Sequence, residues 1–72
     1  MRVIEDAEGR SWDALVGRGS WGSLVILFSL RGDNENRTSD LASETVRQAE
    51  QELAALTDAE LRERLAASRP WE

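Results

Sequence analysis

The sequence contains no histidine, cysteine, lysine or tyrosine in its 72 residues. These residue types supply much of ordinary enzyme chemistry: the proton shuttle near neutral pH, the thiolate, the Schiff-base amine and the phenolic acid. Serine is present, but there is no imidazole in the chain to activate it. We therefore expect a protein that is not an enzyme and needs no cofactor.

The absence of cysteine also excludes disulfides, and with histidine absent it excludes the common zinc sites. A chain of this length buries only about 60–65% of the surface that its unfolded form exposes, so its core is small. Association with a second copy or with a larger protein is the remaining way to add stability. We expect no metal, no small-molecule substrate and a protein partner, with a homo-oligomer as one form of it.

Long hydrophobic runs are absent as well. The longest, residues 24–28, is far shorter than the roughly 20 residues that span a bilayer. The N-terminus lacks the basic, apolar and small-residue pattern of a secretory signal. With no cysteine, these features favour a cytoplasmic protein with no membrane contact. All nine basic residues are arginine, which we interpret as the codon bias of a GC-rich bacterial genome.

The chain is acidic, with a net charge of −5. Residues 1–38 carry five arginines against six acids, and residues 39–72 carry four arginines against eight. A protein that binds nucleic acid non-specifically needs a basic face. Nucleic acid is therefore an unlikely partner by composition, and any such role falls to the first half.

Alternating segments predict an N-terminal β-hairpin. Residues 1–5 and 11–18 have strand character, and Gly9 between them is free to turn. By two-residue alternation Trp12 lies on the apolar face of its strand, so we place it in the core.

Residues 23–30 form the most apolar predicted strand. Leu24, Ile26, Phe28 and Leu30 share one face, and Val25 and Leu27 share the other. A strand that is apolar on both faces is covered on both, or awaits a cover. Two helices can shield only one side of so small a sheet, so the side with Val25 and Leu27 is a candidate interface.

The second half changes to a helical period. Apolar residues recur at spacings of four and three, as on one stripe of a helix: Ala42, Val46, Ala49, Leu53 and Leu56. Ser43 is the expected N-cap. Thr57 and Glu60 form a capping box that begins a second helix. Pro70 ends the helical region and leaves Trp71 either loose or folded back.

Together these patterns predict a single α+β domain over residues 1–72. An antiparallel β-meander over 1–41 has three strands, or four if residues 37–41 form one, and a helical pair over 43–68 packs on one sheet face. The glycines at 17, 19 and 22 fit a dinucleotide-binding pattern, but a strand rather than a helix follows them, so we interpret them as a flexible connection.

Three tryptophans in so short a chain suggest a contact surface. Trp21 lies in the glycine-rich connection next to Arg18, and Trp71 follows a proline, where burial is hard; either could instead fold back over the core. Tryptophan and arginine often anchor interfaces. The sequence thus predicts a protein-interaction module, a small regulator or accessory subunit whose interface contains Arg18, Trp21, Val25, Leu27 and Trp71.

An alternative from another class is a single-stranded nucleic-acid binder. It would stack bases on Trp21 and use the arginines of the first half, at positions 10, 18, 31 and 37. Binding to oligonucleotides that weakens steeply with salt would distinguish it.

Overall fold

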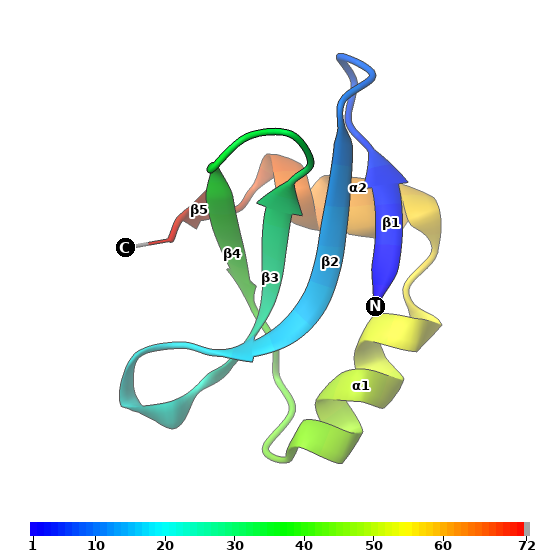
Figure 1. Ribbon diagram of the computed structural model, residues 1–72. Coiled ribbons are helices and arrows are strands. Elements are labelled where there is room, and N and C mark those ends of the chain that lie inside the picture. The colour runs from blue at the N-terminus through cyan, green and yellow to red at the C-terminus, as the bar shows by residue number, and fades with distance from the viewer. Residues whose placement is uncertain (72) are drawn as a thin grey trace.

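A computed structural model describes residues 1–71 of the chain, without the side chain of Ser20. These residues form one antiparallel sheet in the order β1-β2-β3-β4-β5, with two helices beside it (Figure 1). The strands are β1 (Arg2–Glu5), β2 (Ser11–Arg18), β3 (Leu24–Leu30), β4 (Asn36–Asp40) and β5 (Arg69–Pro70). The helices are α1 (Val46–Ala55) and α2 (Asp58–Ala66), and a single 3-10 turn, η1 (Ser20–Gly22), joins β2 to β3. The predicted α+β meander with two C-terminal helices is confirmed.

The strand register separates the two faces of the sheet. Ile4 lies opposite Trp12, Ala14 opposite Phe28, and Val16 opposite Ile26. Residues directly opposite one another share a face, so these side chains gather on the face toward the helices. Trp12 is only 1% exposed, as expected for a core residue.

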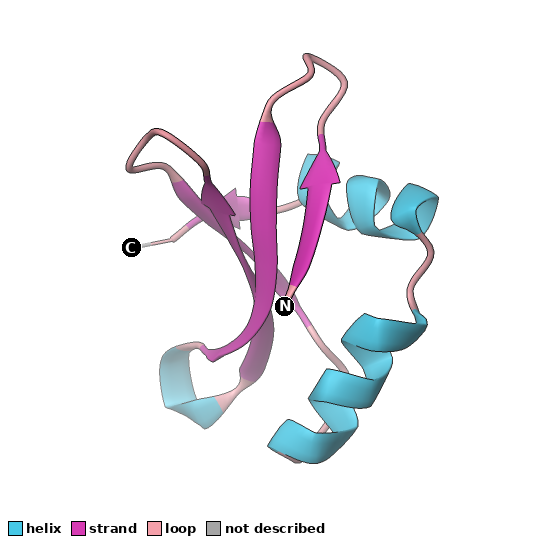
Figure 2. Cartoon of the chain, turned by 45° about the vertical axis from the view of Figure 1, so that its right-hand side comes forward, coloured by secondary structure: helices cyan, strands magenta, loops and turns pink. Residues whose placement is uncertain are grey.

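Both helices cover the same face of the sheet, as Figure 2 shows. The α1 helix contributes Ala49 and Leu53 to the core, and α2 contributes Leu61 and Leu65. The predicted capping box of α2 is present, because the Thr57 side chain accepts from the Glu60 amide and the Glu60 carboxylate from the Thr57 amide. The predicted stripe of the first helix thus packs on the core at Ala49, Leu53 and, in part, Leu56, whereas Val46 is 42% exposed.

The predicted start of the first helix is wrong by two residues. Thr45, not Ser43, is the N-cap, and its hydroxyl accepts from the Gln48 amide at 3.1 Å. The Ser43 hydroxyl instead donates to the Glu52 carboxylate at 2.6 Å. The first residue of the predicted stripe thus lies outside the helix. Ser43 and Thr45 both have a hydroxyl suited to capping. In the folded chain the Ser43 hydroxyl is engaged by Glu52, and Thr45 is the N-cap.

The C-terminal segment adds a strand that the sequence does not predict. Arg69 lies opposite Thr38 and Pro70 opposite Arg37, and the Trp71 amide donates to the Asn36 carbonyl at 2.9 Å. The open question about residues 37–41 is settled by β4, which occupies most of that range. The chain thus returns after the helices to complete the sheet beside β4.

Candidate functional site

The connection between β2 and β3 presents an unusual tryptophan. Trp21 is fully exposed and its backbone is left-handed, with φ 62° and ψ 21°. Bulky residues rarely adopt this region, which costs about 1–2 kcal/mol relative to the right-handed one. The turn is closed beneath it, because the Gly19 amide donates to the Ser23 carbonyl at 2.7 Å. We call residues 19–23 the Trp21 loop; it extends from the end of the sheet, at the lower left of Figure 1.

A groove of about 300 Å³ lies beside this loop, between it and β5. Its lining combines the backbone at Gly19 with Arg18, Val25, Thr38, Arg69, Pro70 and Trp71. We call it the Arg18 groove. It lies on the open face of the sheet, since Val25 and Thr38 alternate with core residues along β3 and β4. The last strand and the Trp21 loop thus form the two sides of one depression.

The floor of the Arg18 groove is covered by the chain itself. Val25 is 1% exposed and Thr38 is 3% exposed. A Cβ placed on Gly19 would lie 3.1 Å from Val25 Cγ1, which is tighter than ordinary contact, so glycine lets the loop approach the sheet. The prediction that this side of β3 is open therefore needs correction at Val25. It holds in part for Leu27, which is partly exposed.

The charges in the Arg18 groove are of one sign. Arg18 and Arg69 line it, and none of its lining residues within the described range 1–71 carries a carboxylate. Arg69 pairs with Asp40 outside the lining, with Nη2 2.8 Å from Oδ1, and this hydrogen bond lowers the pKa of Asp40. Arg18 is exposed and has no hydrogen-bonding or ionic partner within the described part of the chain. Arg18 is thus the lining arginine whose charge is unpaired within residues 1–71.

The five predicted interface residues are brought together only in part. Arg18, Val25 and Trp71 line the Arg18 groove, with Trp71 42% exposed. Trp21 is exposed on the adjoining loop. Leu27 lies next to the groove on the same face, opposite Thr38. The prediction placed these residues on one side of the molecule and missed that Val25 is a floor residue.

Sequence reasoning missed Thr38 and Arg69. They belong to segments 31 residues apart and meet through the pairing of β4 with β5. The strand character of residues 37–41 was the only signal for Thr38, and a two-residue strand that contains a proline gives almost none for Arg69. Both residues enter the site through tertiary structure.

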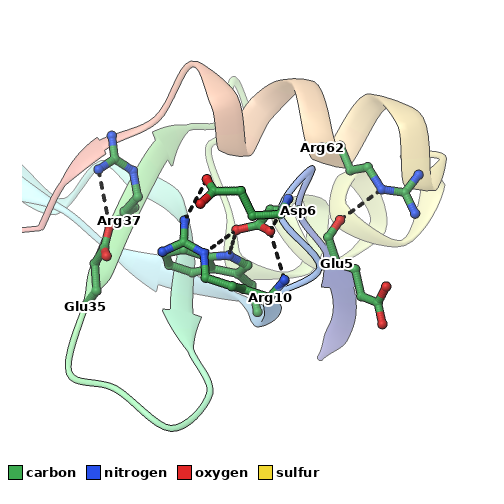
Figure 3. Close-up of polar contacts among 8 residues, drawn as sticks. Glu5, Asp6, Arg10, Glu35, Arg37 and Arg62 are labelled. Atoms are coloured by element: carbon green, nitrogen blue, oxygen red, sulfur yellow. Dashed lines mark hydrogen bonds and ion pairs between the residues drawn. The ribbon is translucent and has the colours of Figure 1, made fainter.

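A second and larger cavity, of about 550 Å³, lies between the β1–β2 turn and α2. Its rim is charged, and Figure 3 shows how the charges pair. Arg10 Nε lies 2.9 Å from Asp6 Oδ2, Arg37 Nη1 lies 3.6 Å from Glu35, and Arg62 Nε donates to the Glu5 carbonyl at 3.0 Å. This rim therefore satisfies most of its own charge.

One carboxylate organises that rim. Asp6 accepts hydrogen bonds from the Trp12 indole and from the backbone amides of Glu8 and Arg10, each at 2.9 Å. The Trp12 hydrogen bond is the largest cause of a lowered Asp6 pKa, which falls to about 2. The Arg10 guanidinium lies 5.7 Å from the centre of the Trp12 ring. A carboxylate held this firmly by its own chain is structural.

The arginines proposed for nucleic-acid binding do not form one basic surface. Arg10 pairs with Asp6, Arg37 with Glu35, and Arg31 with Asp13 at 2.9 Å. Only Arg18 of the four lacks such a pair among the described residues. The nucleic-acid alternative gains no support from this arrangement and stays a prediction.

Residues 1–71 contain no group of three potential metal-ligating side chains that converge. None of the helices in this range has the length and apolar character needed to cross a membrane.

Comparison with known proteins finds no relative: no family model matches the chain, and neither a curated protein nor a solved structure is detectably similar to it. The function proposed below is therefore inferred from the geometry of this chain.

Proposed function

We propose that this chain is a non-enzymatic protein-interaction module, a small regulator or accessory subunit that pairs with itself or docks on a larger protein. The observation that carries the proposal is Trp21, which is fully exposed and held on a left-handed backbone. Asparagine or glycine would fit that backbone with less strain. Tryptophan at this position stabilises nothing within the described chain, and it is among the residues that most often dominate binding energy at interfaces.

The surroundings of Trp21 fit the same role. Trp71 is 42% exposed and lies across the Arg18 groove from the Trp21 loop. The sheet face between and beside them carries the partly exposed side chains of Leu15 and Leu27. Aromatic anchors beside an arginine and a modest apolar area are typical of the central part of an interface.

The edges of the sheet are poor places for a partner strand, which favours docking on the face and loop. On the β1 edge, Arg62 Nε already occupies the Glu5 carbonyl at 3.0 Å, and the strand has only four residues. The β5 edge has two residues, one of them Pro70, which has no amide to donate. Short strands and proline are common devices against edge pairing.

The setting of this module is part of the proposal. The lack of cysteine is compatible with a reducing cytoplasm, and the codon-biased use of arginine with a bacterial source. The missing residue types support a role in contact rather than catalysis.

Self-association is tested by analytical ultracentrifugation over a wide range of protein concentration, with the wild type and Trp21→Asn. Asparagine tolerates a left-handed backbone, so the fold is retained while the anchor is removed. If the module pairs with itself, the wild type shows a concentration-dependent dimer and Trp21→Asn weakens it at least tenfold. Arg47→Gln, which changes an exposed residue on α1, is the matched control and leaves the dimer intact.

Docking on a larger protein is tested by affinity capture from the native cells with the same three baits. The expected result is one protein captured in stoichiometric amount by the wild type and by Arg47→Gln, and lost with Trp21→Asn. The proposal is wrong if the wild type stays monomeric at high concentration and no captured protein distinguishes the Trp21→Asn bait from the others.

A further inference from the structure

We propose that the Arg18 groove binds a carboxylate from an acidic segment of the partner protein. This inference rests on the proposed function, because it names the chemistry of the partner that the module would recognise. Three observations carry it: a hydroxyl on the floor that is open to the groove, a lining arginine without a partner within residues 1–71, and described lining residues whose only charges are those of arginines.

The hydroxyl belongs to Thr38. Its residue is 3% exposed and lines the groove. The hydroxyl has no hydrogen-bond partner within residues 1–71 and is not fully buried, so it is open to the groove. A threonine hydroxyl can donate one hydrogen bond. An oxygen acceptor entering the groove can therefore take the hydrogen bond that this hydroxyl otherwise gives to water.

The arginine is Arg18, whose guanidinium has five donors and no partner in the described chain. Carboxylates are the natural partners of this group, because they accept two parallel hydrogen bonds from it. Arg69 lies across the groove and pairs with the Asp40 carboxylate, which is 65% exposed. Exposed pairs of this kind contribute little, typically below about 1 kcal/mol, so Arg69 keeps part of its attraction for a second anion.

For a bound carboxylate, the charges near the groove matter more than the net charge of the whole chain. The chain carries −5 overall, yet the described residues that line the Arg18 groove include two arginines and no acid. At physiological salt, exposed charges farther apart than about 8 Å are largely screened. A carboxylate inside the groove therefore responds mainly to Arg18, to Arg69 and to the Asp40 carboxylate that pairs with Arg69, and these three charges leave one positive charge in excess.

A protein segment fits better than a nucleic acid. A strand of nucleic acid presents a phosphate at every nucleotide and needs a basic track, whereas Arg10, Arg31 and Arg37 are paired with carboxylates. A single acidic side chain needs only the groove. The exposed ring of Trp71 at its border offers an apolar contact to the residue beside that acid. The segment expected here alternates acidic and apolar residues.

The experiment is an NMR titration of the full-length chain at about 0.1 M salt, where the Debye length is near 10 Å. The probe is a six-residue peptide that alternates glutamate and leucine, with both ends blocked. The expected result is saturable shifts at the side-chain N–H groups of Arg18 and Trp71 and at the Thr38 amide. The same peptide with glutamine in place of glutamate is expected to bind at least tenfold more weakly.

Three variants locate the site. Arg18→Gln should weaken the peptide at least tenfold, and Thr38→Val, which keeps the shape and removes the hydroxyl, should weaken it several-fold with the fold intact. Arg47→Gln makes the same charge change on α1, which packs on the opposite face of the sheet, and should leave binding unchanged.

The inference is overturned if the glutamine peptide binds equally well, if the shifts fall outside the groove, or if Arg18→Gln has no effect. If inorganic phosphate binds as tightly as the peptide or more tightly, the groove is a general anion site. If an eight-nucleotide oligothymidylate does so, the groove is a nucleic-acid site. A dimer that Arg18→Gln dissociates and the peptide does not displace would make the occupant a second copy. If Trp21→Asn abolishes capture of a partner while the peptide fails to bind, the proposed carboxylate site is wrong and the proposed interaction function still holds.

Discussion

The indole nitrogen of Trp12 donates a hydrogen bond to the Asp6 carboxylate at 2.9 Å. The same carboxylate accepts from the backbone amides of Glu8 and Arg10, so one side chain closes the β1–β2 turn and fixes the largest core residue. The turn and the core are thereby coupled through an ionisable group, and stability should depend on its protonation.

The first prediction concerns acid pH. The pKa of Asp6 falls from its ordinary value of 3.8 to about 2 in the folded chain, chiefly through the Trp12 hydrogen bond. Because the folded pKa is the lower one, the stability that Asp6 contributes is complete above about pH 4 and is lost as the pH falls through the folded pKa near 2. We expect the stability advantage of the wild type over Asp6→Asn to shrink over this interval, measured by urea unfolding.

The control for this prediction is Trp12→Phe, which keeps an aromatic ring and removes the indole donor. NMR titration of the Asp6 carboxyl should then give a higher pKa than in the wild type. An Asp6 that titrates near 3.8 in the wild-type protein would contradict the structural assignment.

Local patterns predicted most of the fold. The apolar run of β3, the turn at Gly9 and the capping box at Thr57 each depend on residues close together in the sequence. The prediction of where α1 begins was wrong because Ser43 and Thr45 are both acceptable N-caps. A contact made only in the folded chain decides between them.

The candidate site was harder to predict because its parts are distant in sequence. Trp21 and Arg18 could be identified from residue type and from the glycines around them. Thr38 and Arg69 could not, since they meet only when β5 pairs with β4. The burial of Val25 likewise depends on how closely Gly19 approaches it, which alternation along a strand does not report.

The second prediction is that Trp21 is dispensable for folding. Its side chain is fully exposed and its backbone is left-handed, so Trp21→Asn removes no packing and relieves strain. We expect the free energy of unfolding to stay the same or to rise by up to about 1 kcal/mol. Chemical denaturation followed by far-ultraviolet circular dichroism avoids the loss of the fluorophore. A loss of more than about 1 kcal/mol would mean that Trp21 packs on its own chain.

The third prediction is that Thr38→Val leaves the stability of the free protein nearly unchanged. The hydroxyl has no partner among the described residues and is open to the groove, so its removal breaks no hydrogen bond within residues 1–71. We expect the free energy of unfolding to change by less than about 0.5 kcal/mol. Thr38→Ser keeps the hydroxyl, loses a methyl and should be destabilising. A strongly destabilised Thr38→Val would show that the hydroxyl makes a hydrogen bond within the chain.

The fourth prediction concerns Arg2, which joins the sheet to both helices. Its Nη1 donates to the Leu53 carbonyl at 3.0 Å and to the Leu56 carbonyl at the end of α1, and its Nη2 lies 2.7 Å from the Asp58 carboxylate at the start of α2. A cation at a helix C-terminus is favoured by the exposed carbonyls and the helix dipole. Arg2→Met keeps the apolar stem and removes these hydrogen bonds.

We expect Arg2→Met to lower the free energy of unfolding by about 1–3 kcal/mol, as charged hydrogen bonds typically contribute. Arg47→Met removes an exposed arginine from α1 and should change it by less than about 0.5 kcal/mol. High salt separates the two parts of the Arg2 effect, because it screens the pair with the exposed Asp58 more than the bonds to the helix carbonyls. Most of the loss should therefore persist in 1 M sodium chloride, where the Debye length is about 3 Å. A difference between Arg2→Met and the wild type that disappears at high salt would show that Arg2 acts through Asp58 alone and does not hold the end of α1.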